Sequence, residues 1–116
     1  RSTLFPYTTL FRSRTGALFG FNANLVTELS ADNILSNVVI PGWTLTDKAR
    51  KAFDENIQLH SAKAVPTNRL TVPTDVATLI AYLGSSANGH INGEHIKVSG
   101  HSSLPLMSYI LQEIRK

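Results

Sequence analysis

A short apolar run that stops at a proline and a glycine constrains the fold of this chain most. Ile34 to Ile40, read ILSNVVI, is rich in β-branched residues and apolar on both faces, and Pro41-Gly42 ends it. Such a run is typical of a strand buried in a parallel sheet. A helical pattern over Thr15 to Ser30 precedes it, and helix, turn, buried strand and loop together form half of a βαβ unit. This order predicts an α/β fold.

The helix predicted over Thr15 to Ser30 is expected to bury one face and to end at Ala31-Asp32-Asn33. Gly20 lies inside it and disfavours the helix relative to alanine, which suits a place where another backbone approaches closely. The apolar positions at helical spacing are Leu18, Phe21, Leu25, Val26 and Leu29.

The second half of the chain predicts further helices and a final strand. Asp47 to Leu59 reads as one moderately polar helix, and Ser61 to Val72 as loop. Glu94 to Val98 alternates in polarity, which is typical of a strand. Leu104 to Ile114 predicts a terminal helix.

Pro73 is expected to open another helix, because its missing N–H costs nothing in the first turn and Asp75 there suits the helix dipole. The positions expected to be buried are Val76, Leu79, Ile80 and Leu83.

The first thirteen residues, RSTLFPYTTLFRS, lack helical or strand periodicity. Thr3 to Ser13 back-translates into one reading frame of a widely used sequencing-library adapter, so we interpret Arg1 to Ser13 as a non-native segment. Without its two arginines the formal net charge falls from +3 to +1. The remaining 14–116 predicts a single domain, and its weak charge disfavours nucleic-acid binding.

Composition excludes several further classes of protein. The chain has no cysteine, so it holds neither a disulfide nor a thiolate site. Its four histidines lack the spacing of a zinc pair, so no metal site is predicted. No apolar run has the roughly 20 residues of a membrane span, and no serine lies in the elbow motif of hydrolases.

Three stretches carry a resemblance to a known family. Asn37 to Thr46 is similar to an Asn-x-x-x-Pro-Gly-x-x-x-Thr strand and loop. Asn68 to Leu70 with Pro73 to Ala77 resembles a Gly-Arg…Pro-Glu-Glu-Val-Ala helix start, and His90 to Gly100 resembles a Tyr-Ile-Thr-Gly-Gln-x-Ile-x-Val-Asp-Gly ending. In this order they resemble the C-terminal half of the short-chain dehydrogenase/reductase family over roughly Thr15 to Gly100.

The resemblance implies a Rossmann-like doubly wound parallel sheet, present here as its incomplete C-terminal half, that binds NAD or NADP at the carboxyl ends of its strands. It also implies a cytoplasmic, homo-oligomeric parent enzyme with a small carbonyl or alcohol substrate, and a substrate lid over Thr46 to Thr71. The implied cofactor contacts are Pro41, Gly42, Trp43, Thr44 and Thr46. From the residues alone, Pro41-Gly42 reads equally as a plain turn and Thr46 as a helix N-cap.

The family's tyrosine and lysine pair, four residues apart, is missing. By register these residues would fall near Phe11 and Thr15. The resemblance therefore implies hydride transfer between the cofactor and a carbonyl or secondary alcohol, with 3-oxoacyl reduction as one common family role, but no catalytic residue in this chain. We expect the chain alone to be inactive. The alternative is a non-catalytic module for protein interaction or oligomerisation, because half a sheet leaves an open edge.

Overall fold

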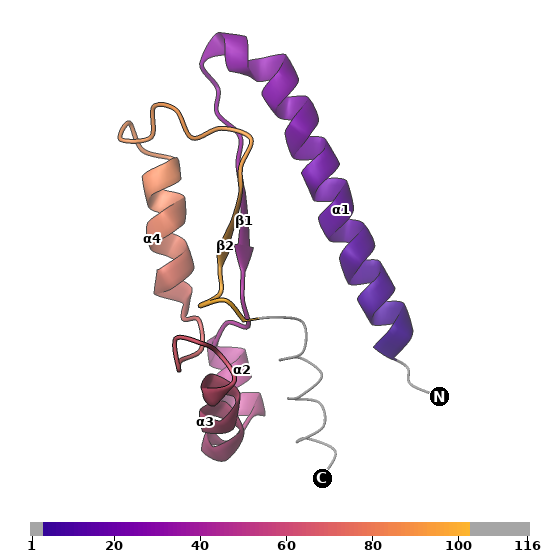
Figure 1. The fold of residues 1–116 in the computed structure, drawn as a ribbon, viewed down its shortest axis with the longest axis vertical. Coiled ribbons are helices and arrows are strands. Elements are labelled where there is room, and N and C mark those ends of the chain that lie inside the picture. Colours follow the sequence, from indigo (N-terminus) through magenta and orange to yellow (C-terminus); the bar gives the residue numbers. More distant parts are fainter. Residues whose placement is uncertain (1–3, 103–116) are drawn as a thin grey trace. The chain divides into compact units, whose positions relative to one another are not determined.

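The computed structural model describes residues 4–102, in which two short strands are preceded and separated by helices (Figure 1). Within this range, residues 4–38 and 88–96 form one compact unit, and residues 39–87 and 97–102 form the other. The elements, in chain order, are α1 (Leu4–Leu29), the 3₁₀ helix η1 (Ser30–Asp32), β1 (Val38–Pro41), α2 (Asp47–Ala52), α3 (Glu55–Lys63), α4 (Pro73–Leu83) and β2 (His95–Val98).

The sheet consists of β1 and β2, and the two strands run in the same direction. The N–H of Val38 donates to the carbonyl of Glu94, and the N–H of Gly42 donates to that of Val98, each at 2.8 Å. Both strands thus advance together, which is the parallel arrangement that the apolar run predicted. The α/β class is confirmed.

Helix α1 begins earlier than predicted. It starts at Leu4 instead of near Thr15, so it includes most of the segment interpreted as non-native. Pro6 lies in its first turn, where a missing N–H breaks no intrahelical bond, so nothing stops the helix there. The predicted end is confirmed, because Asn33 takes a left-handed conformation (φ 61°) and its N–H bonds the carbonyl of Ser30.

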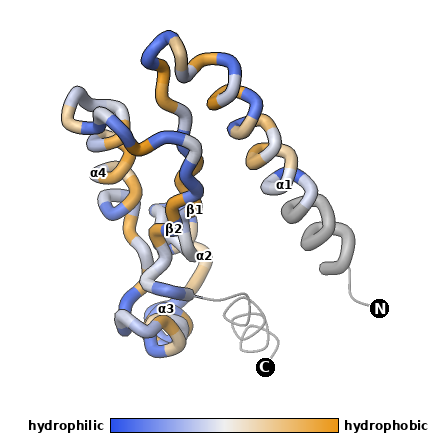
Figure 2. The backbone as a smooth tube through the Cα atoms, turned by 45° about the horizontal axis from the view of Figure 1, so that its top comes forward, coloured by the Kyte–Doolittle hydropathy of each residue, from blue (hydrophilic) through white to orange (hydrophobic). Residues whose placement is uncertain are grey.

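The buried face of α1 matches the predicted stripe only in its second half, where Leu25, Val26 and Leu29 are half-buried. Leu18 and Phe21 are 48% and 59% exposed, whereas Asn22 is 3% exposed. Phe19 stacks on the ring of His95, with centroids 3.9 Å apart. Apolar residues alternate with hydrophilic ones along α1 (Figure 2), so spacing alone did not identify which apolar side chains are covered.

Strand β1 is shorter than the predicted Ile34 to Ile40, because two polar side chains take over the pairing before Val38. The N–H of Ser36 donates to Oδ1 of Asn92 at 2.9 Å. The Asn37 side chain donates to the carbonyl of Ile91 at 2.8 Å and accepts from the N–H of Glu94 at 3.0 Å. Side-chain bonds of this kind replace ladder bonds.

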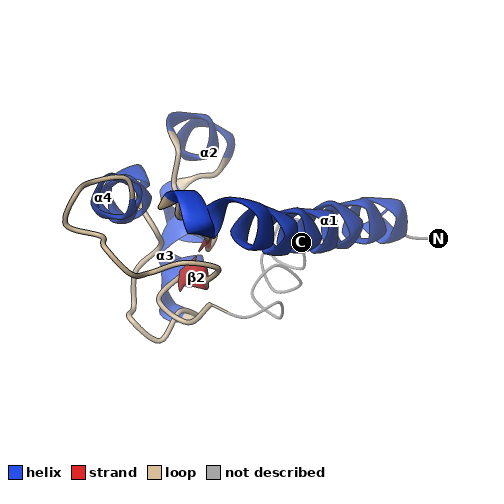
Figure 3. Ribbon diagram, turned by 90° about the horizontal axis from the view of Figure 1, so that it is seen from above, coloured by secondary structure: helices blue, strands red, loops and turns tan. Residues whose placement is uncertain are grey.

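The polar helix predicted over Asp47 to Leu59 is two helices, α2 and α3, which Figure 3 shows as separate. The break comes at Phe53, whose backbone is extended. Oδ1 of Asp54 then accepts from the N–H of Ile57 at 2.9 Å and caps α3. Helix α3 continues to Lys63, so the predicted loop from Ser61 begins later.

Helix α4 begins at Pro73 and β2 ends at Val98, as predicted. Of the four positions of α4 that were expected to be buried, Val76, Leu79 and Leu83 are half-buried. Ile80 is 54% exposed and was wrongly assigned to the core. The predicted terminal helix Leu104 to Ile114 lies outside the described residues.

Gly20 has no neighbouring backbone: an added Cβ would meet no atom within 4 Å. The expected close approach is therefore absent from residues 4–102. Gly20→Ala should stabilise the chain by about 1 kcal/mol, because alanine favours a helix interior over glycine by that amount. Urea unfolding followed by circular dichroism measures this, with the non-helical Gly89→Ala as control. A loss of stability in Gly20→Ala would show that something does pack there.

Candidate functional site

The candidate cofactor loop is Pro41 to Thr46, which follows the carboxyl end of β1 directly. Its glycine is required by packing. A Cβ at Gly42 would lie 2.7 Å from the Cα of Ser99 and 2.9 Å from the Oγ of Ser102. The N–H of Gly42 also continues the sheet by bonding Val98, as described above. Gly42 thus has a structural role whether or not a cofactor lies beside it.

The middle of this loop pairs with the segment before α4. The N–H of Leu45 donates to the carbonyl of Thr71 at 2.8 Å, and Thr44 and Thr71 form an isolated parallel bridge. The hydroxyl of Thr44 donates to the carbonyl of Gly42 at 3.0 Å. The loop is therefore fixed along its length, at Gly42 and again at Leu45.

Thr46 caps α2, because its side-chain oxygen accepts from the N–H of Ala49 at 3.2 Å. The N-cap interpretation is confirmed. It does not exclude a cofactor contact, since a hydroxyl can accept one hydrogen bond and donate another.

Trp43 packs inward, against the buried side chains of Val65 and Leu70. Its ring also meets the ring of Phe53 edge-on, with centroids 5.3 Å apart and planes at 64°. No sequence pattern predicted these partners, which lie 10 to 27 positions further along the chain.

A cavity of about 180 Å³ lies beside this loop's anchor at Thr71, and it is polar. Its lining residues are Thr67, Arg69, Thr71, Asp75, Val98 and Gly100. None of the five predicted cofactor contacts lines it.

Comparison with known proteins decides the family. A family model of the short-chain dehydrogenase/reductase type, described as enoyl-(acyl carrier protein) reductase, matches residues 4–100. The chain belongs to the short-chain dehydrogenase/reductase family. The match begins within the adapter-like segment, whose non-native origin stays a prediction.

Curated relatives of this short-chain dehydrogenase/reductase match most of the length of this chain. The 3-oxoacyl-[acyl-carrier-protein] reductase MabA of Mycobacterium bovis is 36% identical over 88 residues, which cover 76% of this chain and 35% of MabA. Nodulation protein G of Rhizobium meliloti is 32% identical over 98 residues, which cover 82% of this chain and 38% of nodulation protein G. The chain thus spans little more than a third of the length of these relatives.

Solved structures agree on the fold of this family member. The chain matches YwfH, an NADPH-dependent reductase of bacilysin biosynthesis, with a TM-score of 0.67 and 25% identity over 77% of this chain and 37% of YwfH. It also matches a 7α-hydroxysteroid dehydrogenase solved with NADH and 7-oxo glycochenodeoxycholic acid, again with a TM-score of 0.67. The identity is 29%, and the match covers 78% of this chain and 35% of the dehydrogenase. The Rossmann-like fold class is confirmed.

Two of the motif residues of this short-chain dehydrogenase/reductase form an ion pair that sequence reasoning did not identify. Nη1 and Nη2 of Arg69 donate to Oδ2 and Oδ1 of Asp75 at 2.6 and 2.9 Å. Oδ2 of Asp75 also accepts from the N–H of Val72 at 2.9 Å, just before α4. An arginine six positions before an acidic residue in a first helical turn is the signal that could have revealed it.

Arg69, and next the N–H of Val72, lower the pKa of Asp75 from 3.8 to about 2. A carboxyl whose pKa is lower in the folded chain stabilises it above its ordinary pKa, and that stability disappears as the pH falls through about 2. Urea midpoints measured from pH 5 down to about pH 2 should therefore fall less steeply in Asp75→Asn than in the wild type. Asp32→Asn, at an exposed position, is the control. Equal slopes in Asp75→Asn and the wild type would contradict the pairing.

No cluster of three or more metal-ligating side chains occurs among residues 4–102. Within the same range, no helix is both long and apolar enough to cross a membrane. Phe11 and Thr15, where the family's tyrosine and lysine were expected by register, are one turn apart in α1; that register stays a prediction.

Proposed function

We propose that this chain is the cofactor-loop segment of an NAD(P)-dependent oxidoreductase that reduces a carbonyl or oxidises a secondary alcohol. The observation that carries the proposal is the loop Pro41 to Thr46, which leaves the carboxyl end of a parallel strand, where such folds bind dinucleotides. The relatives include an NADPH-dependent reductase and a dehydrogenase solved with NADH, which supports either dinucleotide.

The residues of the loop suit this cofactor. Pro41 is exposed and presents an apolar ring beside which a flat nicotinamide can lie, with Gly42 and Trp43 continuing the backbone beneath it. The hydroxyls of Thr44 and Thr46 can each form a hydrogen bond with the carboxamide or the pyrophosphate of the dinucleotide. The dinucleotide, when bound, would supply the hydride for carbonyl reduction or accept it in alcohol oxidation, and the chain would orient it.

The substrate class that the relatives support is a 3-oxoacyl thioester, because several of them are 3-oxoacyl-[acyl-carrier-protein] reductases. The cytoplasmic location and the choice between NAD and NADP stay predictions.

Binding of NADH and NADPH to the chain, measured by calorimetry, tests the cofactor proposal. Thr44→Val should weaken the binding roughly five- to tenfold, since it removes one hydrogen bond to a polar ligand. Thr78→Val is the matched control, because its hydroxyl bonds only carbonyls of α4, those of Thr74 and Asp75. Equal affinity in the wild type and Thr44→Val would contradict the proposed contact.

The chain by itself should not catalyse. Phe11 has no acidic proton to donate to a carbonyl, and Thr15 has no cation to lower a neighbouring pKa. Mixing the chain with NADPH and a 3-oxoacyl thioester should give no oxidation of NADPH above background. Detectable turnover would refute this assignment.

The alternative, an oligomerisation module, is supported by the exposed apolar side chains. Leu18 and Phe21 project from α1, and Ile80 and Tyr82 project from α4, all between 45% and 59% exposed. Groups of this kind favour association with another chain. Size-exclusion chromatography with light scattering distinguishes the cases, because a clean monomer would count against the alternative.

A further inference from the structure

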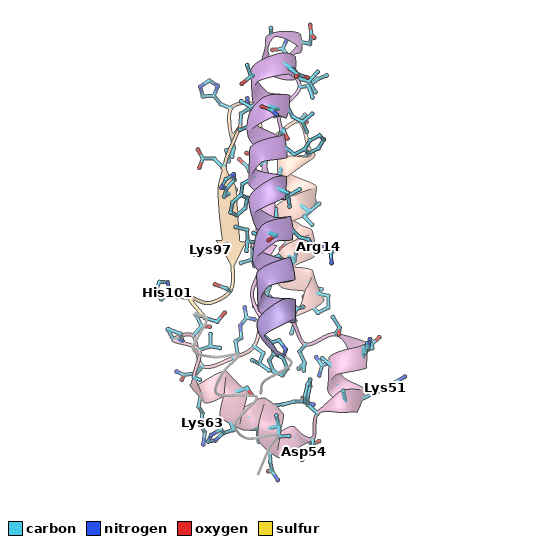
Figure 4. The ribbon with its side chains drawn as sticks, turned by 90° about the vertical axis from the view of Figure 1, so that its right-hand side faces the viewer. Arg14, Lys51, Asp54, Lys63, Lys97 and His101 are labelled. Carbon is cyan, nitrogen blue, oxygen red and sulfur yellow. The ribbon has the colours of Figure 1, made fainter. Side chains whose placement is uncertain are left out.

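The two short helices that follow the candidate loop bury few of their residues. Helix α2 buries no residue, and α3 buries only Ser61. Figure 4 labels Lys51 on α2, and Asp54 and Lys63 at the two ends of α3, as charged side chains on this pair. Since so little of the pair is covered, each contact with the rest of its unit matters for its position.

The joint between α2 and α3 carries contacts that hold the pair together, while Ala62 of α3 packs against the core of Val65 and Leu70. Phe53 has an extended backbone (φ −121°, ψ 131°), and its N–H bonds the carbonyl of Ala49. Nε2 of Gln58, in α3, donates to the carbonyl of Phe53 at 2.7 Å and to that of Arg50 at 3.4 Å. These bonds tie α3 to the end of α2 but not to the loop.

The ring of Phe53 makes a side-chain contact with the loop, in addition to the bonds that the N–H groups of Ala49 and Arg50 in α2 donate to Thr46. It meets Trp43 edge-on, as described above, and Trp43 in turn packs on Val65 and Leu70. Trp43 lies between the two anchored positions of the loop, Gly42 and Leu45. A displacement of the loop therefore moves the surface on which Phe53 rests.

We propose that Phe53 is a positioning residue that couples the loop Pro41 to Thr46 to helices α2 and α3 through the ring of Trp43. A dinucleotide that orders the loop then also orders the two helices. The dinucleotide part of this inference rests on the proposed function; the coupling itself does not.

A double-mutant cycle read by hydrogen exchange tests the coupling in the full chain. Phe53→Leu and Trp43→Leu should each speed amide exchange in residues 47–63 by roughly two- to tenfold, the range that an aromatic pair contributes. The double variant should exchange no more than about twofold faster than either single variant. If the increase in exchange rate in the double variant equals the product of the increases in the two single variants, Phe53 and Trp43 act independently and the proposal is overturned.

Two variants control for other causes. Phe53→Tyr keeps the ring and should leave exchange in 47–63 unchanged, whereas Leu59→Ala removes an exposed apolar side chain of α3 and should also change little. Residues 15–30 of α1 serve as the internal reference. If Phe53→Leu speeds exchange there as much as in 47–63, its effect is global and the proposal fails.

Adding NADH or NADPH separates this proposal from the proposed function. In the wild type, exchange should slow in both 41–46 and 47–63; in Phe53→Leu it should slow in 41–46 alone. Slowing of both segments in Phe53→Leu would overturn the coupling while leaving cofactor binding intact. No slowing in the wild type would overturn cofactor binding, and the cycle without cofactor would still decide the coupling.

Discussion

Gly42→Ala should destabilise the chain by about 2 kcal/mol, in the range that overpacking a tight site costs. The new methyl group would lie 2.7 Å from both Cα and Cβ of Ser99, and a backbone Cα cannot rotate away as a long side chain can. Relieving the clash also pulls the N–H of Gly42 from the carbonyl of Val98. Urea unfolding followed by the fluorescence of Trp43, the only tryptophan, measures the loss.

Gly89→Ala is the matched control for Gly42→Ala. An added Cβ at Gly89 meets nothing within 4 Å, so the same chemical change should alter stability by less than about 0.5 kcal/mol. If Gly42→Ala behaves like this control, the close approach of Ser99 is wrong, and the glycine would then need another explanation, such as a ligand.

Gly100→Ala should cost more, about 3 kcal/mol, because left-handed strain of about 1–2 kcal/mol adds to a steric clash. The backbone of Gly100 has φ +58°, and an added Cβ would collide with Oγ1 of Thr67 and lie 2.9 Å from Cγ1 of Val65. Val65 is 2% exposed, so it has little room to move. Urea unfolding again provides the measurement.

Gly93→Ala separates the strain at Gly100 from the clash. Gly93 also has positive φ, +74°, but an added Cβ there would meet Val26 at an ordinary 3.5 Å. Gly93→Ala should therefore show the strain alone and lose less stability than Gly100→Ala. Equal losses of stability in Gly93→Ala and Gly100→Ala would mean that Val65 and Thr67 move aside without a loss of stability, so that no clash occurs at Gly100.

The elements that the sequence predicted well have local signals. Pro73 in a first turn, Asn33 at a helix end and the alternation of His95 to Val98 act over a few residues, so a pattern shows them. The candidate loop Pro41 to Thr46 was found for the same reason: a proline and a glycine directly follow a buried strand. Its role as a cofactor site stays a prediction.

The features that the sequence did not reveal depend on partners far along the chain. Asn22 is 3% exposed and its Oδ1 accepts from the hydroxyl of Ser36 at 2.6 Å, and no helical periodicity predicts a buried asparagine. The inward packing of Trp43 depends on Phe53 and on the core around Val65. Spacing finds an apolar face, but only tertiary contacts decide which face is covered.

The pairing of β1 with β2 has a consequence for how the chain folds. The two strands are separated by more than fifty residues, and the bonds of Ser36 and Asn37 span 56 and 54 positions. The entropy of closing so long a loop is lost before the first bond between the strands forms. Helices α1 and α4, whose backbone hydrogen bonds join residues a few positions apart, can form on a much shorter timescale. The sheet, and with it the anchoring of Gly42, should therefore be the last part of the molecule to assemble.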